Sequence, residues 1–290
     1  MVRSDFLWAA REGHRVRGLF MCRTVSRFSL LALVVAFATL AVAQGDYKVI
    51  AVTDGGTISG TVKWSGPVPR DLEFPITKDP EICALDGKKT TSLERLIVGP
   101  EGGVANTIVY LKNITSGKAM DLPVQRRHLD QKQCRYIPHI LLVPQNESLT
   151  MVSSDATLHT IHMDGAATFN LPFPFVGRPT TRTMATPGVV NLRCNGGHIW
   201  MNAEMMVVAH PYYAVTDESG RYEFTDVPPG AYQIVAWHEG WGLVGREHAY
   251  DVLTGQGVER PVFTEPKAWE KSVTVEGNQV STVDFAISNR

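Results

Sequence analysis

RCNGGHIWMNAEMM, residues 193–206, is the stretch that decides the fold, because it places a cysteine, a histidine and a methionine close together. Cys194 precedes His198 by four positions, and Met201 follows His198 by three. Thiolate and thioether sulfur are soft donors that suit Cu(I), and imidazole suits both oxidation states of copper. We interpret the stretch as the source of three ligands of a metal site, which needs a second histidine from another strand.

The second histidine is expected in SSDATLHTIHMDG, residues 153–165, which ends a strand-like run. His159 lies 35 residues before Cys194, and a β-sandwich can bring such a turn next to the cysteine loop. His162 is the alternative to His159. Residues three apart in a strand point to opposite faces, so only one of the two histidines is expected to face the metal.

The predicted metal ligands are His159, Cys194, His198 and Met201. Two histidines and a cysteine in a trigonal arrangement, with a weak axial methionine, form the geometry of single-electron transfer by copper. Glu204 is the alternative to Met201 and would supply a harder oxygen ligand. The sequence contains neither the cysteine pairs of closed zinc sites nor the motifs of hydrolases and nucleotide-binding enzymes, so no enzyme activity is predicted. Structural roles are assigned to Met205, Met206, His139, His210 and His238.

Short β-branched and apolar runs, separated by glycine and proline turns, fill the chain after residue 46, whereas helix signals are scarce. This pattern favours an all-β fold made of β-sandwiches. Two segments, 65–90 and 239–270, have no regular strand pattern. The expected strands are 56–64, 106–114, 139–144, 147–154, 188–194, 205–210, 220–224, 231–237 and 281–287.

DATLHTIH followed by CNGGHIWM resembles the cupredoxin family, the plastocyanin- and amicyanin-like copper proteins. In that family the upstream histidine ends one strand, and the cysteine, histidine and methionine share one loop. The resemblance implies a cupredoxin-like Greek-key β-sandwich that binds copper. Residues 134–159 resemble the preceding family strands, which implies a long β-hairpin leading into His159. The family's dinuclear site needs a cysteine where this chain has Val190, so a mononuclear site is expected.

A second resemblance lies in HPYYAVTDESGRYEFTDVPPGAYQIVAWHEG, residues 210–240, which is similar to the carboxypeptidase regulatory-like domain, a transthyretin-like β-sandwich. Residues 56–69 resemble the opening strand of that family and residues 277–288 its closing strand. The resemblance implies a cupredoxin-like sandwich that is either inserted in one such sandwich or placed between two. The whole combination resembles exported bacterial methylamine utilisation and plastocyanin-like proteins.

The predicted domains follow from these resemblances. They are an N-terminal regulatory-like β segment at 46–95, a cupredoxin-like copper domain at 96–210, and a regulatory-like β-sandwich at 211–290.

Residues 1–43 are predicted to be a signal peptide with an N-terminal signal helix. Arg23 and Arg27 precede an uncharged, mostly apolar run of sixteen residues, 28–43, that ends in AVA. That run is shorter than the ~20 residues that span a bilayer, which favours a cleaved signal over a membrane anchor. Met21 is a better start, so residues 1–20 are interpreted as a gene-start error. The protein is expected to be periplasmic or secreted, with no stable membrane span after cleavage.

Removal of residues 1–43 leaves 22 basic and 27 acidic side chains, a net charge of -5. This mildly acidic balance predicts no nucleic-acid partner. Three of the four cysteines remain, and a free thiol outside the cytoplasm oxidises unless it is protected. If Cys194 binds metal, Cys83 and Cys134 are left to form a disulfide. Two buried free thiols are the alternative.

The predicted function is that of an exported mononuclear copper protein that exchanges single electrons with a redox partner protein. Two alternatives share the same residues. One is a metal-free β-sandwich that serves as a scaffold or surface-binding protein. The other is a copper storage or delivery protein. Donor atoms of the two histidines and the cysteine that meet near one point would favour a metal site over the scaffold.

Overall fold

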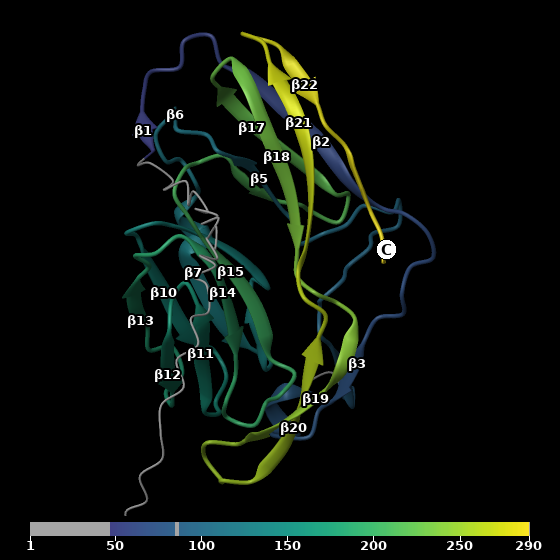
Figure 1. Ribbon diagram of the computed structural model, residues 1–290. Coiled ribbons are helices and arrows are strands. Elements are labelled where there is room, and N and C mark those ends of the chain that lie inside the picture. Colours follow the sequence, from purple (N-terminus) through teal and green to yellow (C-terminus); the bar gives the residue numbers. More distant parts are fainter. Residues whose placement is uncertain (1–46, 85–86, 290) are drawn as a thin grey trace, which may run out of the picture. The chain divides into compact units, whose positions relative to one another are not determined.

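A computed structural model describes residues 47–84 and 87–289, which fold almost entirely into β-strands (Figure 1). The all-β fold class is therefore confirmed. The predicted signal peptide and its helix lie outside the described residues. Within the described part of the chain, no helix is long and apolar enough to cross a membrane.

One β-sandwich, here called the inserted sandwich, is formed by residues between 118 and 210. Its larger sheet has the strand order β12 (Phe169–Phe173), β11 (His159–Gly165), β14 (Gly188–Arg193), β15 (Asn202–Val208) and β9 (Ile140–Pro144). Its smaller sheet has the order β13 (Thr180–Thr183), β10 (Ser148–Ser153), β7 (His128–Lys132) and β8 (Arg135–Ile137). Apolar side chains from both sheets form one core, which contains Leu129, Leu141, Ile161 and Met205.

Strands β9 and β10 follow one another in the chain but lie in different sheets, so the predicted long β-hairpin before His159 is wrong. β9 pairs in parallel with β15, whereas β10 pairs in parallel with β7. The physical reason is visible in the sequence. All five residues of β9 are apolar and buried, because its sheet is covered on both faces, while β10 alternates between buried and more accessible residues.

The second sandwich, here called the host sandwich, combines strands from before and after the inserted one. One sheet has the order β16 (Tyr213–Val215), β5 (Ile108–Lys112), β18 (Gly230–His238) and β21 (Lys267–Val275). The other has the order β17 (Arg221–Val227), β2 (Gly56–Trp64) and β22 (Val280–Thr282), and β23 (Phe285–Ile287) also pairs with β2. The two regulatory-like segments of the sequence thus contribute to a single sandwich.

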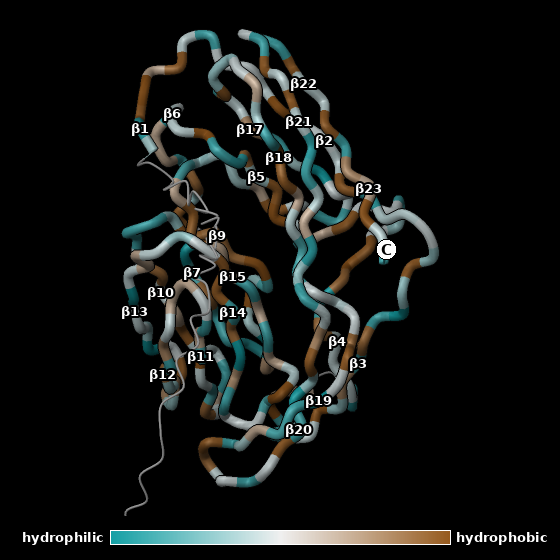
Figure 2. The backbone as a smooth tube through the Cα atoms, in the orientation of Figure 1, coloured by the Kyte–Doolittle hydropathy of each residue, from teal (hydrophilic) through white to brown (hydrophobic). Residues whose placement is uncertain are grey.

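Strand β5 belongs to the host sandwich, which corrects the prediction of a copper domain over residues 96–210. Its side chains explain the pairing. Val109 and Leu111 point into the host core, and Ile108 points into a separate apolar cluster with Trp237 of β18 and Leu142 of β9. That cluster joins the two sandwiches, and Figure 2 shows hydrophobic stretches on strands of both.

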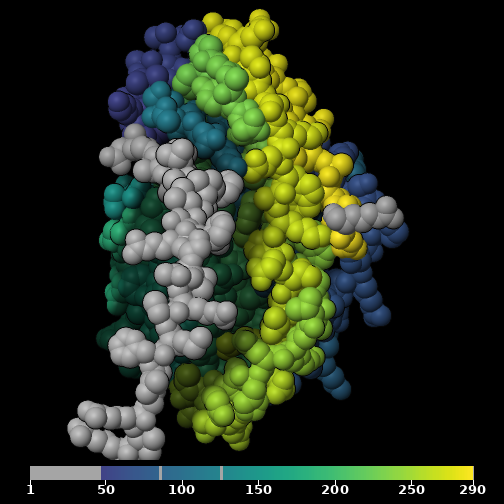
Figure 3. Space-filling model, viewed as in Figure 1, coloured from purple at the N-terminus to yellow at the C-terminus, as the bar shows by residue number. Residues whose placement is uncertain are grey.

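Several smaller elements complete the fold. The segment 239–270, which showed no regular pattern, contains a long hairpin of β19 (Leu243–Tyr250) and β20 (Gly257–Phe263), visible at the surface in Figure 3. Nearly every side chain of β19 is exposed, so the strand has no buried face and hence no alternation. The other elements are β1 (Lys48–Val49) with β6 (Ser116–Gly117), β3 (Glu73–Pro75) with β4 (Thr90–Ser92), α1 (Pro80–Cys83) and the 3-10 turn η1 (Val124–Arg127).

Candidate metal centre

Three of the four predicted ligands meet at one end of the inserted sandwich. His159 is the first residue of β11, and Cys194 directly follows β14. These strands are antiparallel neighbours, so the start of one lies beside the end of the other. His198 comes from the loop that leads into β15. The side chains of His159 and His198 are fully buried, and Cys194 is 1% exposed.

The donor atoms of these three residues are spaced as a trigonal metal site requires. The Nδ1 atoms of His159 and His198 are 3.2 Å apart, and Nδ1 of His198 lies 3.8 Å from Sγ of Cys194. All three donors lie within 4.8 Å of one another. Metal bonds of roughly 2.0 Å to nitrogen and 2.3 Å to sulfur, at 120°, would separate these donors by about 3.5 and 3.7 Å. The group therefore fits a single small metal ion.

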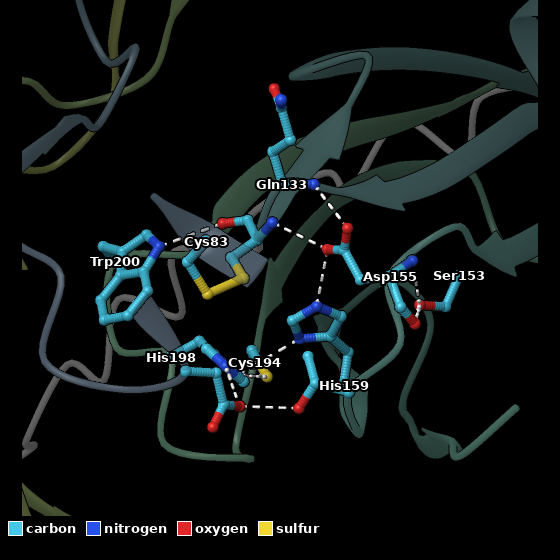
Figure 4. Close-up of a disulfide and its surroundings, with 11 residues drawn as sticks. Cys83, Gln133, Ser153, Asp155, His159, Cys194, His198 and Trp200 are labelled. Atoms are coloured by element: carbon cyan, nitrogen blue, oxygen red, sulfur yellow. Dashed lines mark hydrogen bonds and ion pairs between the residues drawn. A yellow bond between two sulfur atoms is a disulfide. The ribbon is translucent and has the colours of Figure 1, made fainter. Parts of the chain in front are cut away.

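Each imidazole also has a carboxylate partner at its other ring nitrogen, Nε2. Figure 4 shows this for Asp155 and His159. Nε2 of His159 lies 2.9 Å from Oδ2 of Asp155, and Nε2 of His198 lies 3.0 Å from Oδ2 of Asp79. Burial raises the pKa of both aspartates, but their hydrogen bonds outweigh it and lower the pKa of each. An ionised carboxylate accepts a hydrogen bond from Nε2–H, which leaves Nδ1 as the ring nitrogen that can bind a metal once it has no proton.

Hydrogen-bond donors surround the sulfur of Cys194. The backbone N–H groups of Gly196 and Thr160 lie 3.3 and 3.4 Å from Sγ. Burial raises the pKa of Cys194, but hydrogen bonds from His159 and His198 outweigh it and lower that pKa to about 5. Burial likewise lowers the pKa of His159, yet Asp155 and the Cys194 sulfur raise it to about 9. The site thus presents a thiolate, the ligand form of cysteine, at neutral pH.

Met201, the predicted axial ligand, is buried next to these residues. It is 2% exposed and belongs to the apolar core of the inserted sandwich. Its backbone N–H donates to the carbonyl of His198, and its own carbonyl lies 3.4 Å from the N of Cys194. These bonds close the ligand loop into a compact turn. The axial role of the Met201 sulfur stays a prediction.

The two alternative ligands lie in other surroundings. Nε2 of His162 lies 3.1 Å from a guanidinium nitrogen of Arg193, on the opposite side of β11 from His159. Glu204 lies in a buried ion-pair cluster, 3.8 Å from Arg95, and its pKa is raised well above the usual value by burial and by Glu239. Neither residue is grouped with the three converging donors.

The ligand loop is covered by the turn at the tip of the β19–β20 hairpin. The N–H of Val252 donates to the carbonyl of Asn195 at 2.9 Å, and Arg260 donates to the carbonyl of Cys194 at 3.2 Å. Gly197 has a φ of 86°, and a Cβ there would lie 2.6 Å from a carboxylate oxygen of Asp251. Glycine is therefore required where the loop passes under the hairpin.

The predicted disulfide between Cys83 and Cys134 is present, with the Cα atoms 5.1 Å apart. Both sulfurs lie within 4.8 Å of a ring nitrogen of His198, but they are bonded to each other and offer no thiolate. Sequence reasoning missed Asp79 and Asp155. Asp155 precedes His159 by four residues, which is a weak signal, and nothing in the sequence connects Asp79 with His198.

Comparison with known proteins gives a family match for part of the chain. Residues 209–261 match the family model described as BOS complex subunit NOMO1-like, second beta sandwich domain. This match covers less than half of the chain and supports the β-sandwich expected there. The finer resemblance to the carboxypeptidase regulatory-like family stays a prediction. No curated protein matches the sequence.

Solved structures resemble shorter parts of the chain. A purple cupredoxin from Nitrosopumilus maritimus is 19% identical, with a TM-score of 0.25, over 28% of this chain and 98% of that one. The copper-containing nitrite reductase from Thermus scotoductus is 21% identical, with a TM-score of 0.27, over 31% of this chain and only 24% of its own. A reduced amicyanin variant is 20% identical, with a TM-score of 0.26, over 28% and 80%.

Proposed function

We propose that this chain is an exported, mononuclear copper-binding protein that transfers single electrons. The observation that carries the proposal is the convergence of His159, Cys194 and His198, whose donor atoms lie within 4.8 Å of one another in a buried position. A thiolate with two imidazoles suits copper better than hard divalent cations. The same convergence argues against the metal-free scaffold, which gives no reason to bury these donors together.

Each residue has a distinct part in the proposed site. Cys194 supplies a thiolate that backbone N–H groups already stabilise, so at neutral pH a metal displaces a proton from His159 but not from the sulfur. His159 and His198 supply Nδ1 atoms that their carboxylate partners orient. Copper bound there would alternate between Cu(I) and Cu(II), taking up and releasing one electron. Ligands held in this way change position little, which favours rapid electron transfer.

The test is the visible and electron-paramagnetic-resonance spectrum of the copper-loaded mature chain. We expect one copper per chain and a strong thiolate-to-copper absorption, both lost in Cys194→Ser. His162→Gln is the matched control, because it removes a nearby histidine outside the donor group. Wild-type protein that binds no copper, or Cys194→Ser protein that binds it equally well, would refute the proposal.

Copper storage or delivery is the second candidate, and the burial of the ligands favours it. His159 and His198 are fully buried, Cys194 is 1% exposed, and hairpin residues cover the ligand loop. A storage protein would hold Cu(I) without cycling. Reversible one-electron voltammetry of the loaded protein would support electron transfer, whereas Cu(I) release without a reversible wave would support storage.

A further inference from the structure

We propose that the Cys83–Cys134 disulfide positions the two carboxylates that accept hydrogen bonds from the ligand histidines, Asp79 and Asp155. Reduction of the disulfide would then weaken metal binding. The inference deepens the proposed function and rests on it. It assigns positioning roles to two aspartates and a redox-dependent role to a bond that otherwise would only stabilise the fold. Three independent sets of contacts carry it.

Cys134 connects the disulfide to His159 through Asp155. Gln133 and Cys134 form the turn between β7 and β8, and both have positive φ, 51° and 54°. Their N–H groups donate to the two carboxylate oxygens of Asp155 at 2.7 and 2.8 Å, and the same carboxylate accepts from His159. Left-handed backbone is unfavourable for these residues, so the turn and the carboxylate hold each other in place.

Cys83 connects the disulfide to His198 through Asp79. Asp79 immediately precedes the short helix α1, which ends at Cys83, and the N–H of Cys83 donates to the carbonyl of Asp79 at 2.9 Å. The side chain of Asp79 accepts from Thr157 at 2.6 Å and from His198 at 3.0 Å. Helix α1 is a single turn in a segment with few regular elements, so the disulfide is its covalent attachment to the inserted sandwich.

The ligand loop itself provides the third connection. The indole N–H of Trp200 donates to the carbonyl of Cys134 at 3.0 Å, and its ring packs edge-on against His198 with centroids 5.5 Å apart. Cys134 therefore contacts the surroundings of both histidines through its N–H, its carbonyl and its sulfur. Figure 4 shows the disulfide next to Trp200, Asp155 and the two ligand histidines.

Reduction of the disulfide would loosen the contacts that position Asp79 and Asp155, and the reaction does not involve the metal. A dithiol reductant gives two electrons and two protons to the disulfide, which becomes two thiols, and the dithiol becomes a disulfide. Helix α1 then loses its covalent attachment, and Asp79 no longer has a fixed position against His198. The loss of such an outer partner typically lowers metal affinity by about 10- to 100-fold. We expect a loss of that size in copper affinity when the disulfide is absent.

A double-mutant cycle tests whether the disulfide acts through Asp79. Copper affinity is measured by competition with a chelator of known affinity for wild type, for the disulfide-free variant Cys83→Ser/Cys134→Ser, for Asp79→Ala and for the variant that combines the two changes. Both cysteines are replaced because a single free thiol would lie within 4.8 Å of His198 and could itself bind copper. We expect either change to weaken binding about 10-fold or more, and the combined variant to be no weaker than the weaker of the two. Effects that multiply, or a disulfide-free variant with wild-type affinity, would overturn the proposal. Val283→Ala in the host core is the control for lost stability, with unchanged affinity expected.

Two further measurements keep the inference separate from the proposed function. Wild-type protein that binds no copper defeats the proposed function. The inference then stands or falls on the metal-free protein, in which nuclear magnetic resonance reads the tautomer of His198. We expect the Nε2–H form in wild type and a mixture of tautomers in Cys83→Ser/Cys134→Ser. If that variant does not fold, the folded wild type is reduced with a phosphine, and an unchanged tautomer of His198 in the reduced protein would overturn the proposed role of the disulfide.

Discussion

Replacement of Asp155 most directly tests how the site is held together, because its buried carboxylate accepts hydrogen bonds from three donors. It is 6% exposed and accepts hydrogen bonds from the N–H groups of Gln133 and Cys134 and from Nε2 of His159, at 2.7, 2.8 and 2.9 Å. Alanine at this position would leave all three donors without their acceptor. It would also remove the interaction that favours two consecutive residues with positive φ.

The expected cost follows from those contacts. A buried donor deprived of its partner costs about 1–3 kcal/mol, and water reaches some of the vacated space, so Asp155→Ala should lower the free energy of unfolding by about 3–5 kcal/mol. Asparagine retains one acceptor oxygen but places an NH₂ group against an N–H donor. Asp155→Asn should therefore cost less, about 1–2 kcal/mol.

The assay is urea unfolding of metal-free protein with the disulfide intact, so that neither copper nor thiol chemistry contributes. Glu223→Ala, a change at an exposed position of β17, is the control and should change the free energy of unfolding by less than about 0.5 kcal/mol. An Asp155→Ala protein within about 1 kcal/mol of wild type would show that the carboxylate does not support the turn and His159 as described.

Three other predictions concern the buried histidine, the ligand loop and the metal. Burial lowers the pKa of His210 to about 4, so the ionisation of His210 should make the free energy of unfolding fall by up to about 3 kcal/mol as the pH decreases from ~6.5 toward 4. That fall should be smaller in His210→Phe, and identical pH profiles would contradict it. Gly197→Ala should cost about 1–2 kcal/mol for its left-handed backbone and displace Asp251, seen as weaker copper binding than in Gly245→Ala. Copper at about 1,000 times its dissociation constant should stabilise the chain by about 4 kcal/mol, measured as a higher unfolding temperature that a chelator reverses; an unchanged temperature would count against a folded-state site.

The parts of the site that the sequence predicts are those set by local spacing. His159 and His162 are three residues apart in a strand, and the structure places them on opposite faces, with only His159 beside Cys194 and His198. The disulfide between Cys83 and Cys134 could be reached by elimination once Cys194 was given to a metal. The role of Met201 stays a prediction.

The parts that the sequence does not predict depend on tertiary placement. Asp79 approaches His198 from a segment with little regular structure, across 119 positions of the chain, and no local pattern reports such a contact. Strands β9 and β10 looked like a hairpin because a short turn joins them, but full burial of β9 assigns it to a different sheet. The β19–β20 hairpin has no buried face on β19 and therefore gave no alternation.

The insertion of one sandwich into the other has a consequence for the order of folding. Strands β2 and β5 emerge early during synthesis, yet their partners β17 and β18 follow only after residues 118–210 have been made. Such distant pairings carry a high entropic cost and form slowly. The inserted sandwich can complete all its own sheets first, and its closure brings Lys118 within 3.0 Å of the hydroxyl of Tyr212, where the two halves of the host must join. The inserted sandwich, which contains the candidate metal centre, would then nucleate the assembly of the host sandwich that surrounds it in sequence.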